Sequence, residues 1–212
     1  MRWSLILLAI FSYQASAGFY GEPLVNRLAG KWTQDIAATT PITGTVKGEG
    51  DISGFQYGGR LGYAWEGFNL GLQVSAAKGK EKSSKMTLTI GNTSTVENLP
   101  DTDFTRTDNG MVFGYKFGPL FRMWFSALNS QLKIKDSDGT TTKYKGVTGL
   151  LGFGWYVEHI ISINLEVGGS QYSEEDGKKY PVTQVIDGET FVASEYKEAL
   201  IFFGVSIPFG MY

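Results

Sequence analysis

The sequence predicts an all-β protein, an eight-stranded antiparallel up-and-down barrel. Three observations predict this fold: a high content of glycine and aromatic residues, apolar residues at every second position, and connections that alternate between short and long. Of 212 residues, 28 are glycine and 14% are aromatic, while the net charge is −2. This composition excludes a disordered chain and a basic surface for nucleic acid. The absence of cysteine from the sequence excludes a disulfide scaffold.

The first 17 residues are typical of an export signal. Arg2 supplies a positive charge, residues 3–11 are apolar, and Ala15-Ser16-Ala17 fits the small-residue rule for cleavage. The apolar stretch is too short for a stable membrane span. We therefore expect residues 1–17 to be a cleaved signal peptide and residues 18–212 to form one domain.

Alternating apolar residues predict the strands, because side chains of a strand point to opposite faces in turn. Two such runs, 55–65 and 68–77, meet at Glu66-Gly67 and predict a hairpin. Further runs cover 110–117, 120–134, 147–157, 161–168 and 198–209. Residues 26–38 are the candidate for the remaining strand. The faces of 120–134 do not separate by hydropathy.

The connections differ in length in a regular way. They are tight at 66–67, 118–119 and 158–159, and long at 38–52, 79–104, 135–142 and 174–194. Because alternate connections of a meander lie at the same end, the tight turns gather at one end and the long loops at the other. Aromatic residues near the tight turns predict a girdle at a membrane interface, with members Tyr63, Trp65, Phe68, Phe117 and Trp155.

With this layout the chain resembles the small eight-stranded outer-membrane β-barrels of the OmpA/OmpX kind. Its ending, Gly204, Ile207 and Phe209, is similar to the assembly signal of that family, although Phe203 replaces a polar residue and 210–212 extend beyond it. The resemblance implies a transmembrane barrel in the cell outer membrane, with short periplasmic turns and longer extracellular loops. It also implies recognition by the barrel assembly machinery, and contact with outer-membrane lipids and lipopolysaccharide.

In such a barrel the alternate, polar residues face the lumen. The predicted lumen-facing network contains Arg60, Glu66, Arg106, Asp108, Lys116, Glu166 and Glu198. Buried charges of mixed sign are expected to pair, and eight strands enclose a space that side chains fill. We therefore expect a lumen largely plugged by polar side chains and a structural or surface-interaction role. A narrow channel for small solutes is the alternative, because inward glycines leave spare volume.

The sequence is also compatible with a soluble periplasmic ligand-binding barrel, in which the apolar faces would point inward, and with a lipid-modifying enzyme. The single histidine, His159, lies in a tight turn, and no serine elbow or metal-spaced histidine pair occurs. We expect no enzyme, cofactor or metal site. A basic run, Lys78, Lys80, Lys82 and Lys85, is a candidate contact for lipopolysaccharide phosphates. No pattern identifies a surface ligand.

Overall fold

The computed structural model describes residues 18–40, 44–157, 161–186 and 189–210, which form strands joined by turns and short loops. Eight long strands make up the wall: β1 (Gly18–Thr40), β2 (Gly44–Trp65), β3 (Phe68–Ile90), β5 (Thr102–Phe117), β6 (Phe121–Lys135), β7 (Thr141–Val157), β8 (Ile161–Glu175) and β12 (Tyr196–Ser206). Each is antiparallel to its neighbours. In this part of the chain no helix is long and apolar enough to cross a membrane.

The eight strands close into a ring. Going around it, the order is β1, β2, β3, β5, β6, β7, β8 and β12, and β12 pairs with β1 again. The last bridge lies beyond β12, where Gly21 and Phe209 exchange both backbone hydrogen bonds at 2.9–3.0 Å. Closure leaves no edge strand along the wall, which is how a sheet satisfies its backbone in lipid.

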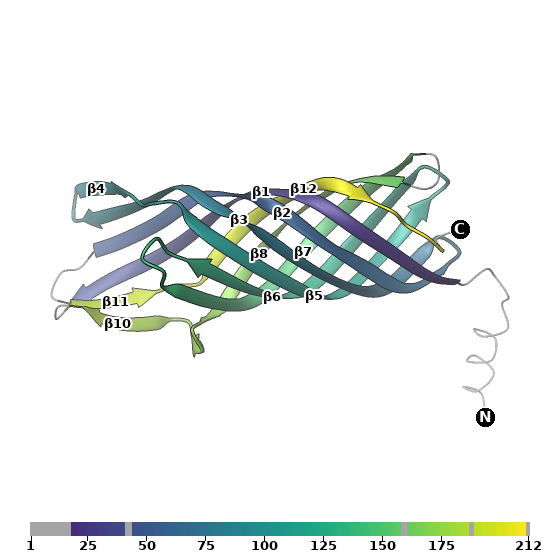
Figure 1. Cartoon of the computed structure of the whole chain (residues 1–212). Helices are drawn as coiled ribbons and strands as arrows, with labels where there is room; N and C mark the ends of the chain where they lie inside the picture. Colours follow the sequence, from purple (N-terminus) through teal and green to yellow (C-terminus); the bar gives the residue numbers. More distant parts are fainter. Residues whose placement is uncertain (1–17, 41–43, 158–160, 187–188, 211–212) are drawn as a thin grey trace, which may run out of the picture.

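The two ends of the barrel differ, as Figure 1 shows. One end, here called the tight-turn end, carries the turns after β2 and β5 and the start of β1 and end of β12. The other, the loop end, carries four short strands: β4 (Thr93–Asn98), β9 (Lys178–Lys179), β10 (Val182–Ile186) and β11 (Glu189–Ala193). There β4 extends the sheet beside β3, and β11 and β10 extend it beside β1.

The strands reach further toward the loop end than the sequence predicted. Residues predicted as loops at 38–52 and 79–104 are largely strand, since β1 runs to Thr40, β2 begins at Gly44 and β3 runs to Ile90. The first strand also begins at Gly18 rather than near residue 26. The physical reason is that the wall leaves the apolar surroundings there. Outward side chains such as Lys47, Glu49 and Lys80 are charged, so the outward apolar series that marks a strand ends.

The outer wall bears a broad apolar belt near the tight-turn end. Its side chains are 36–64% exposed: Phe19, Val25, Phe55, Tyr57, Leu61, Tyr63, Trp65, Phe68, Leu70, Leu72, Val74, Met111, Phe113, Phe117, Phe125, Val147, Leu151, Trp155, Val157, Ile161, Ile163, Val167, Ile201, Phe203, Val205, Ile207 and Phe209. The possibility of a soluble barrel with its apolar faces inward is therefore wrong. On β6, Arg122, Trp124 and Ser126 point inward and Phe125 outward.

Some predictions fall outside the described residues. They concern the signal peptide at 1–17, the turn with His159, and residues 211–212 of the extension beyond the assembly signal.

Candidate functional site

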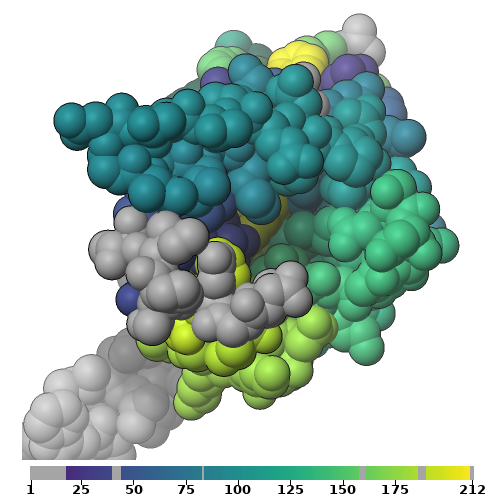
Figure 2. All heavy atoms as spheres, turned by 90° about the vertical axis from the view of Figure 1, so that its left-hand side faces the viewer, coloured from purple at the N-terminus to yellow at the C-terminus, as the bar shows by residue number. Residues whose placement is uncertain are grey.

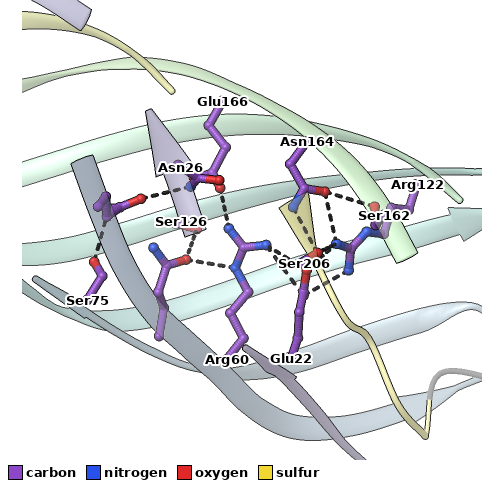
Figure 3. A network of polar contacts seen from close by, with 12 residues as sticks. Glu22, Asn26, Arg60, Ser75, Arg122, Ser126, Ser162, Asn164, Glu166 and Ser206 are labelled. Carbon is purple, nitrogen blue, oxygen red and sulfur yellow. Dashed lines mark hydrogen bonds and ion pairs between the residues drawn. The ribbon is translucent and has the colours of Figure 1, made fainter. Parts of the chain in front are cut away.

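Four charged side chains meet inside the barrel at the level of the apolar belt. Glu22, Arg60, Arg122 and Glu166 are at most 2% exposed. Arg60 Nη2 lies 2.6 Å from Glu166 Oε1, and Arg122 Nη1 donates a hydrogen bond to Glu22 Oε2 at 2.8 Å, as Figure 3 shows. Arg60 also reaches Glu22 at 3.4 Å. We call these four residues the lower charge cluster.

Neutral polar groups complete the shell of the lower charge cluster. Arg60 Nε donates to Gln73 Oε1 at 2.9 Å. Arg122 Nη2 donates to Asn164 Oδ1 and Ser206 Oγ, each at 3.2 Å. The indole of Trp124 contacts both guanidinium groups, whose carbons lie 4.4 and 4.6 Å from its ring centroid. Buried ions are tolerated when they are both paired and hydrogen-bonded. Glu22 and the two arginines meet this condition, whereas among the described residues Glu166 Oε2 has no hydrogen-bond partner.

A second group of charges, the upper charge cluster, consists of Arg106, Asp108 and Glu198. The Arg106 guanidinium donates to Glu198 Oε2 and to Asp108 Oδ1, both at 2.8 Å. Its Nη2 also donates to Thr148 Oγ1 at 2.7 Å, while the hydroxyl of Tyr172 donates to Glu198 Oε2 at 2.9 Å. All three charged residues are buried.

Ion pairs in both clusters cross the full width of the barrel. Glu22 lies on β1 and Arg122 on β6, which are four places apart in a ring of eight and thus diametrically opposite. Arg106 on β5 and Glu198 on β12 are also four places apart. Each cluster therefore joins opposite sides of the barrel through its ion pairs, and we call each such connection a bar.

The interior also contains a large apolar group that sequence reasoning missed. We call it the upper core: Leu28, Trp32, Ile52, Ala77, Phe104, Leu128, Leu132, Ile134, Tyr144, Leu150, Tyr172, Tyr196, Leu200 and Phe202. The ring of Tyr196 stacks on Trp32 at 5.5 Å and on Tyr144 at 4.9 Å. These residues belong to the same inward series as the charges, so reading that series for apolar as well as polar members would have found them.

Two residues of the predicted network lie at the tight-turn end, outside both charge clusters. Glu66 is exposed in the turn between β2 and β3, with φ of 46°, so the turn and not the alternation of the strand sets its direction. Lys116 is half-buried near the tight-turn end, with its ammonium 4.9 Å from the ring centroid of Tyr156. Both line a cavity of about 370 Å³ that opens at that end.

Glu22 is the charged residue that the prediction lacked. It precedes residue 26, where the first strand was expected to begin, and Pro23 follows it. The inward series Tyr20, Glu22, Leu24 continues without a break into the predicted strand, and this alternation was the available signal.

The five residues predicted for the aromatic girdle all lie exposed on the outer wall. Their rings form a chain of contacts through neighbouring strands. Phe68 lies 6.1 Å from Trp65, and Phe121 lies 5.8 Å from Phe117 and 5.7 Å from Trp155. This chain follows the tight-turn end of the belt, where aromatic side chains suit a headgroup region.

The C-terminal residues predicted as an assembly signal lie at the seam between β1 and β12. Ile207 and Phe209 face outward, 47% and 52% exposed. Gly204 pairs with Asn26, and a Cβ at Gly204 would lie 2.1 Å from the carbonyl oxygen of Val25. Only a residue without a side chain fits this close approach.

In the described ranges, no group of three or more histidine, aspartate or glutamate side chains is placed to hold a metal ion. The basic run is exposed on β3, where Lys80 lies 3.8 Å from Asp103. Among the described residues, the charged groups of the interior lie mainly in ion pairs.

No protein-family model matches the chain, and no curated protein matches it. Solved structures do. OprG from Pseudomonas aeruginosa aligns with a TM-score of 0.54 at 11% identity, over 91% of this chain and 96% of that one. Neisserial surface protein A aligns at 0.45 with 14% identity, over 90% and 97%. The attachment invasion locus protein of Yersinia pestis, in complex with a heparin analogue, aligns at 0.41 with 11% identity, over 89% and 99%.

The match to OprG agrees with the closed ring of strands, and the apolar belt agrees with a wall that faces lipid. A closed barrel satisfies its backbone without water, as a bilayer requires. The chain therefore has the fold of the small eight-stranded outer-membrane β-barrel proteins.

Proposed function

We propose that this protein is an integral protein of the outer membrane with a structural or surface-interaction role and a lumen that conducts no ions. Residues 1–17 direct its export and are removed. The tight-turn end faces the periplasm, and the loop end stands at the cell surface. No catalytic role forms part of this proposal.

The observation that carries the proposal is the pair of bars across the interior. An ion that passes through must separate Glu22 from Arg122 and Arg106 from Glu198, whose contacts are fully buried. Removing one partner from a buried pair costs about 3–5 kcal/mol, because the other charge is left without compensation. Thermal motion therefore opens each bar rarely.

The upper core adds a second obstacle. Leu28, Leu200 and Phe202 are at most 2% exposed and occupy the inward series of β1 and β12. Apolar constrictions exclude water and so stop ions. A closed lumen leaves the loop end, where the wall extends past the belt, as the part able to meet partners, since binding functions concentrate in such exposed segments.

The test is conductance of the purified protein in a planar lipid bilayer, with a known porin as positive control. We expect no discrete current steps from the wild type. Steps of defined size would overturn the closed lumen, and a change of their ion selectivity in Glu22→Gln would establish the narrow channel instead. Fractionation of cells and N-terminal sequencing test location and export, for which we expect the outer membrane and a first residue of Gly18.

A further inference from the structure

The loop end contains a cleft that neither charge cluster reaches. Figure 2 looks onto this end, which is hollowed between the β3–β4 hairpin and the β10–β11 hairpin. The cleft has a volume of about 240 Å³. Its walls are mainly apolar, and its lining includes Ile36, Val46, Met86, Val182 and Phe191. Pockets of this kind, apolar with a few polar groups, are the usual form of small-molecule sites.

One end of the cleft is polar and held in place by hydrogen bonds. Gln34 Nε2 donates to the hydroxyl of Tyr180 at 3.0 Å, and this hydroxyl donates to Glu175 Oε2 at 2.6 Å. Burial and then the bond to Glu175 raise the pKa of Tyr180, so that its hydroxyl stays protonated and donating. Both Gln34 and Glu175 line the cleft. The carboxylate is thus fixed in direction.

Glu174 and Glu175 differ in whether a cation lies beside the carboxylate. Glu174 lies 2.7 Å from the ammonium of Lys145. Within the described residues, no lysine or arginine is within ion-pair distance of Glu175. The cleft is apolar and ends at the Glu175 carboxylate. It therefore favours a ligand that has an apolar part and an ammonium group, because the ammonium can donate a charge-assisted hydrogen bond to the carboxylate.

The apolar wall continues beyond the cleft. An adjoining cavity of about 350 Å³ shares Val46, Met86 and Phe191 with it and extends to Leu88 and Ile90. Those two side chains are 37% and 40% exposed although they lie on the inner side of the shell. Apolar surface is therefore available to a tail that leads away from Glu175.

We propose that this cleft binds a small amphipathic amine, with its ammonium at Glu175 and its apolar tail along Val46 and Met86. The cleft is smaller than the 300–1,000 Å³ typical of drug-sized ligands, so a chain of about six carbons is the fitting size. The inference rests on the surface role proposed above and is independent of whether the lumen conducts.

The chain itself provides a reporter that separates binding from partition into lipid. Met86 lines the cleft, whereas Met111 is 56% exposed in the apolar belt. We would label methionine methyl groups with ¹³C, reconstitute the protein in phosphatidylcholine nanodiscs and titrate with hexylamine. We expect a saturable shift of the Met86 methyl signal at concentrations that leave Met111 unchanged. A shift confined to Met111, or no saturable shift at Met86, would overturn the proposal.

Matched ligands and variants test the role of the carboxylate. Glu175→Gln should weaken the binding of hexylamine at least about tenfold, as the loss of a charge-assisted hydrogen bond predicts. The same substitution should leave the affinity for 1-hexanol unchanged. Glu174→Gln is the control and should bind as the wild type does. Hexanoate should bind more weakly than hexylamine. Equal affinity of Glu175→Gln and wild type for hexylamine, or of hexanoate and hexylamine for the wild type, would refute the assignment.

A failure of this proposal differs from a failure of the proposed function. Conductance steps in a planar bilayer concern the lumen, whereas the Met86 signal concerns the loop end. If hexylamine leaves Met86 unchanged and the bilayer stays silent, the closed barrel stands and only the amine site falls.

Discussion

At the scale of single residues, Glu22 holds the lower charge cluster together, because it is shared by two guanidinium groups. Arg122 donates to it at 2.8 Å and Arg60 at 3.4 Å. Without its charge, two buried cations would face Glu166 alone. A buried charge cluster contributes little to the stability of the fold when all its partners are present, and it destabilises the fold strongly when one partner is missing.

We therefore expect Glu22→Gln to destabilise the folded barrel by about 3–5 kcal/mol, the range for breaking a buried ion pair. Urea unfolding in detergent micelles measures it. The control is Glu49→Gln, which removes an exposed partner of Lys47 at 3.1 Å. Surface pairs contribute about 0–1 kcal/mol, so equal losses in the two variants would contradict this view of the interior.

Glu81 gives the loop-end half of the barrel a pH dependence. It lies on β3 above the apolar belt, beyond the exposed Lys78 and Lys80, and accepts hydrogen bonds from Tyr196 at 2.7 Å and Thr102 at 3.2 Å. Burial, as the main cause, raises the pKa of Glu81 from 4.5 to about 7. The folded state thus holds this proton more tightly than the unfolded state does.

The sign of the effect follows from linkage. Glu81 contributes stability below pH 4.5, and the contribution is lost as pH rises through about 7. Glu81→Gln should remove this loss and unfold at higher urea than the wild type at pH 8, with little difference at pH 4.5. Urea midpoints at the two pH values measure it. Glu97→Gln, on the exposed β4, should keep the wild-type dependence.

At the scale of elements, the seam between β1 and β12 is the place where the ring closes, and Gly204 sets its width. A methyl group there would lie 2.1 Å from the carbonyl oxygen of Val25 and 2.3 Å from the side chain of Asn26. The two strands cannot move apart without loss of their ladder.

Gly204→Ala should therefore lower the fraction of protein that resists SDS until it is boiled, as seen by a heat-modifiability gel. Gly149→Ala serves as the control, since a Cβ there meets its nearest atom, on Phe125, at 3.9 Å. An unchanged folded fraction in Gly204→Ala would show that the seam tolerates more width than its geometry indicates.

Phe209→Ala tests recognition by the assembly machinery separately. If Phe209 belongs to the assembly signal, the variant should assemble more slowly in cells.

Sequence reasoning worked where the surroundings of a strand are uniform. Between Phe55 and Val74, one face meets lipid and the other the lumen, so hydropathy alternates and predicts β2 and β3. Sequence reasoning failed beyond the belt toward the loop end. Lys78 and Lys80 face water there, so the sequence of the strand is as polar as that of a loop. It also assigned Glu66 to the lumen, because alternation does not show where a turn begins. Contacts across the ring, such as Glu22 with Arg122, have no local signal.

At the scale of the whole molecule, the barrel is longer than its apolar belt. Outward side chains are apolar up to about Val74 on β3 and become charged at Lys78 and Lys80. An outer-membrane belt is about 25 Å tall. The loop end therefore stands above the bilayer surface.

Labelling of single cysteines on intact cells tests this arrangement, and the natural chain has no cysteine to interfere. Lys80→Cys should react with a membrane-impermeant maleimide on intact cells. Leu72→Cys, within the belt, should stay unlabelled, and Glu66→Cys should react only after the outer membrane is permeabilised. Labelling of Glu66→Cys on intact cells would reverse the orientation proposed here.

The ring also has a consequence for how the molecule forms. Glu22 comes from the first strand, Arg122 from the middle of the chain and Ser206 from the last strand. Contacts so distant in sequence form slowly, because a long loop must be closed before they contribute. Until β12 arrives, an unfinished barrel holds its arginines without the final shell and with β1 open to pairing. We therefore expect completion to be a late, cooperative step, and a chain cut short before β12 to leave one side of β1 without its partner strand.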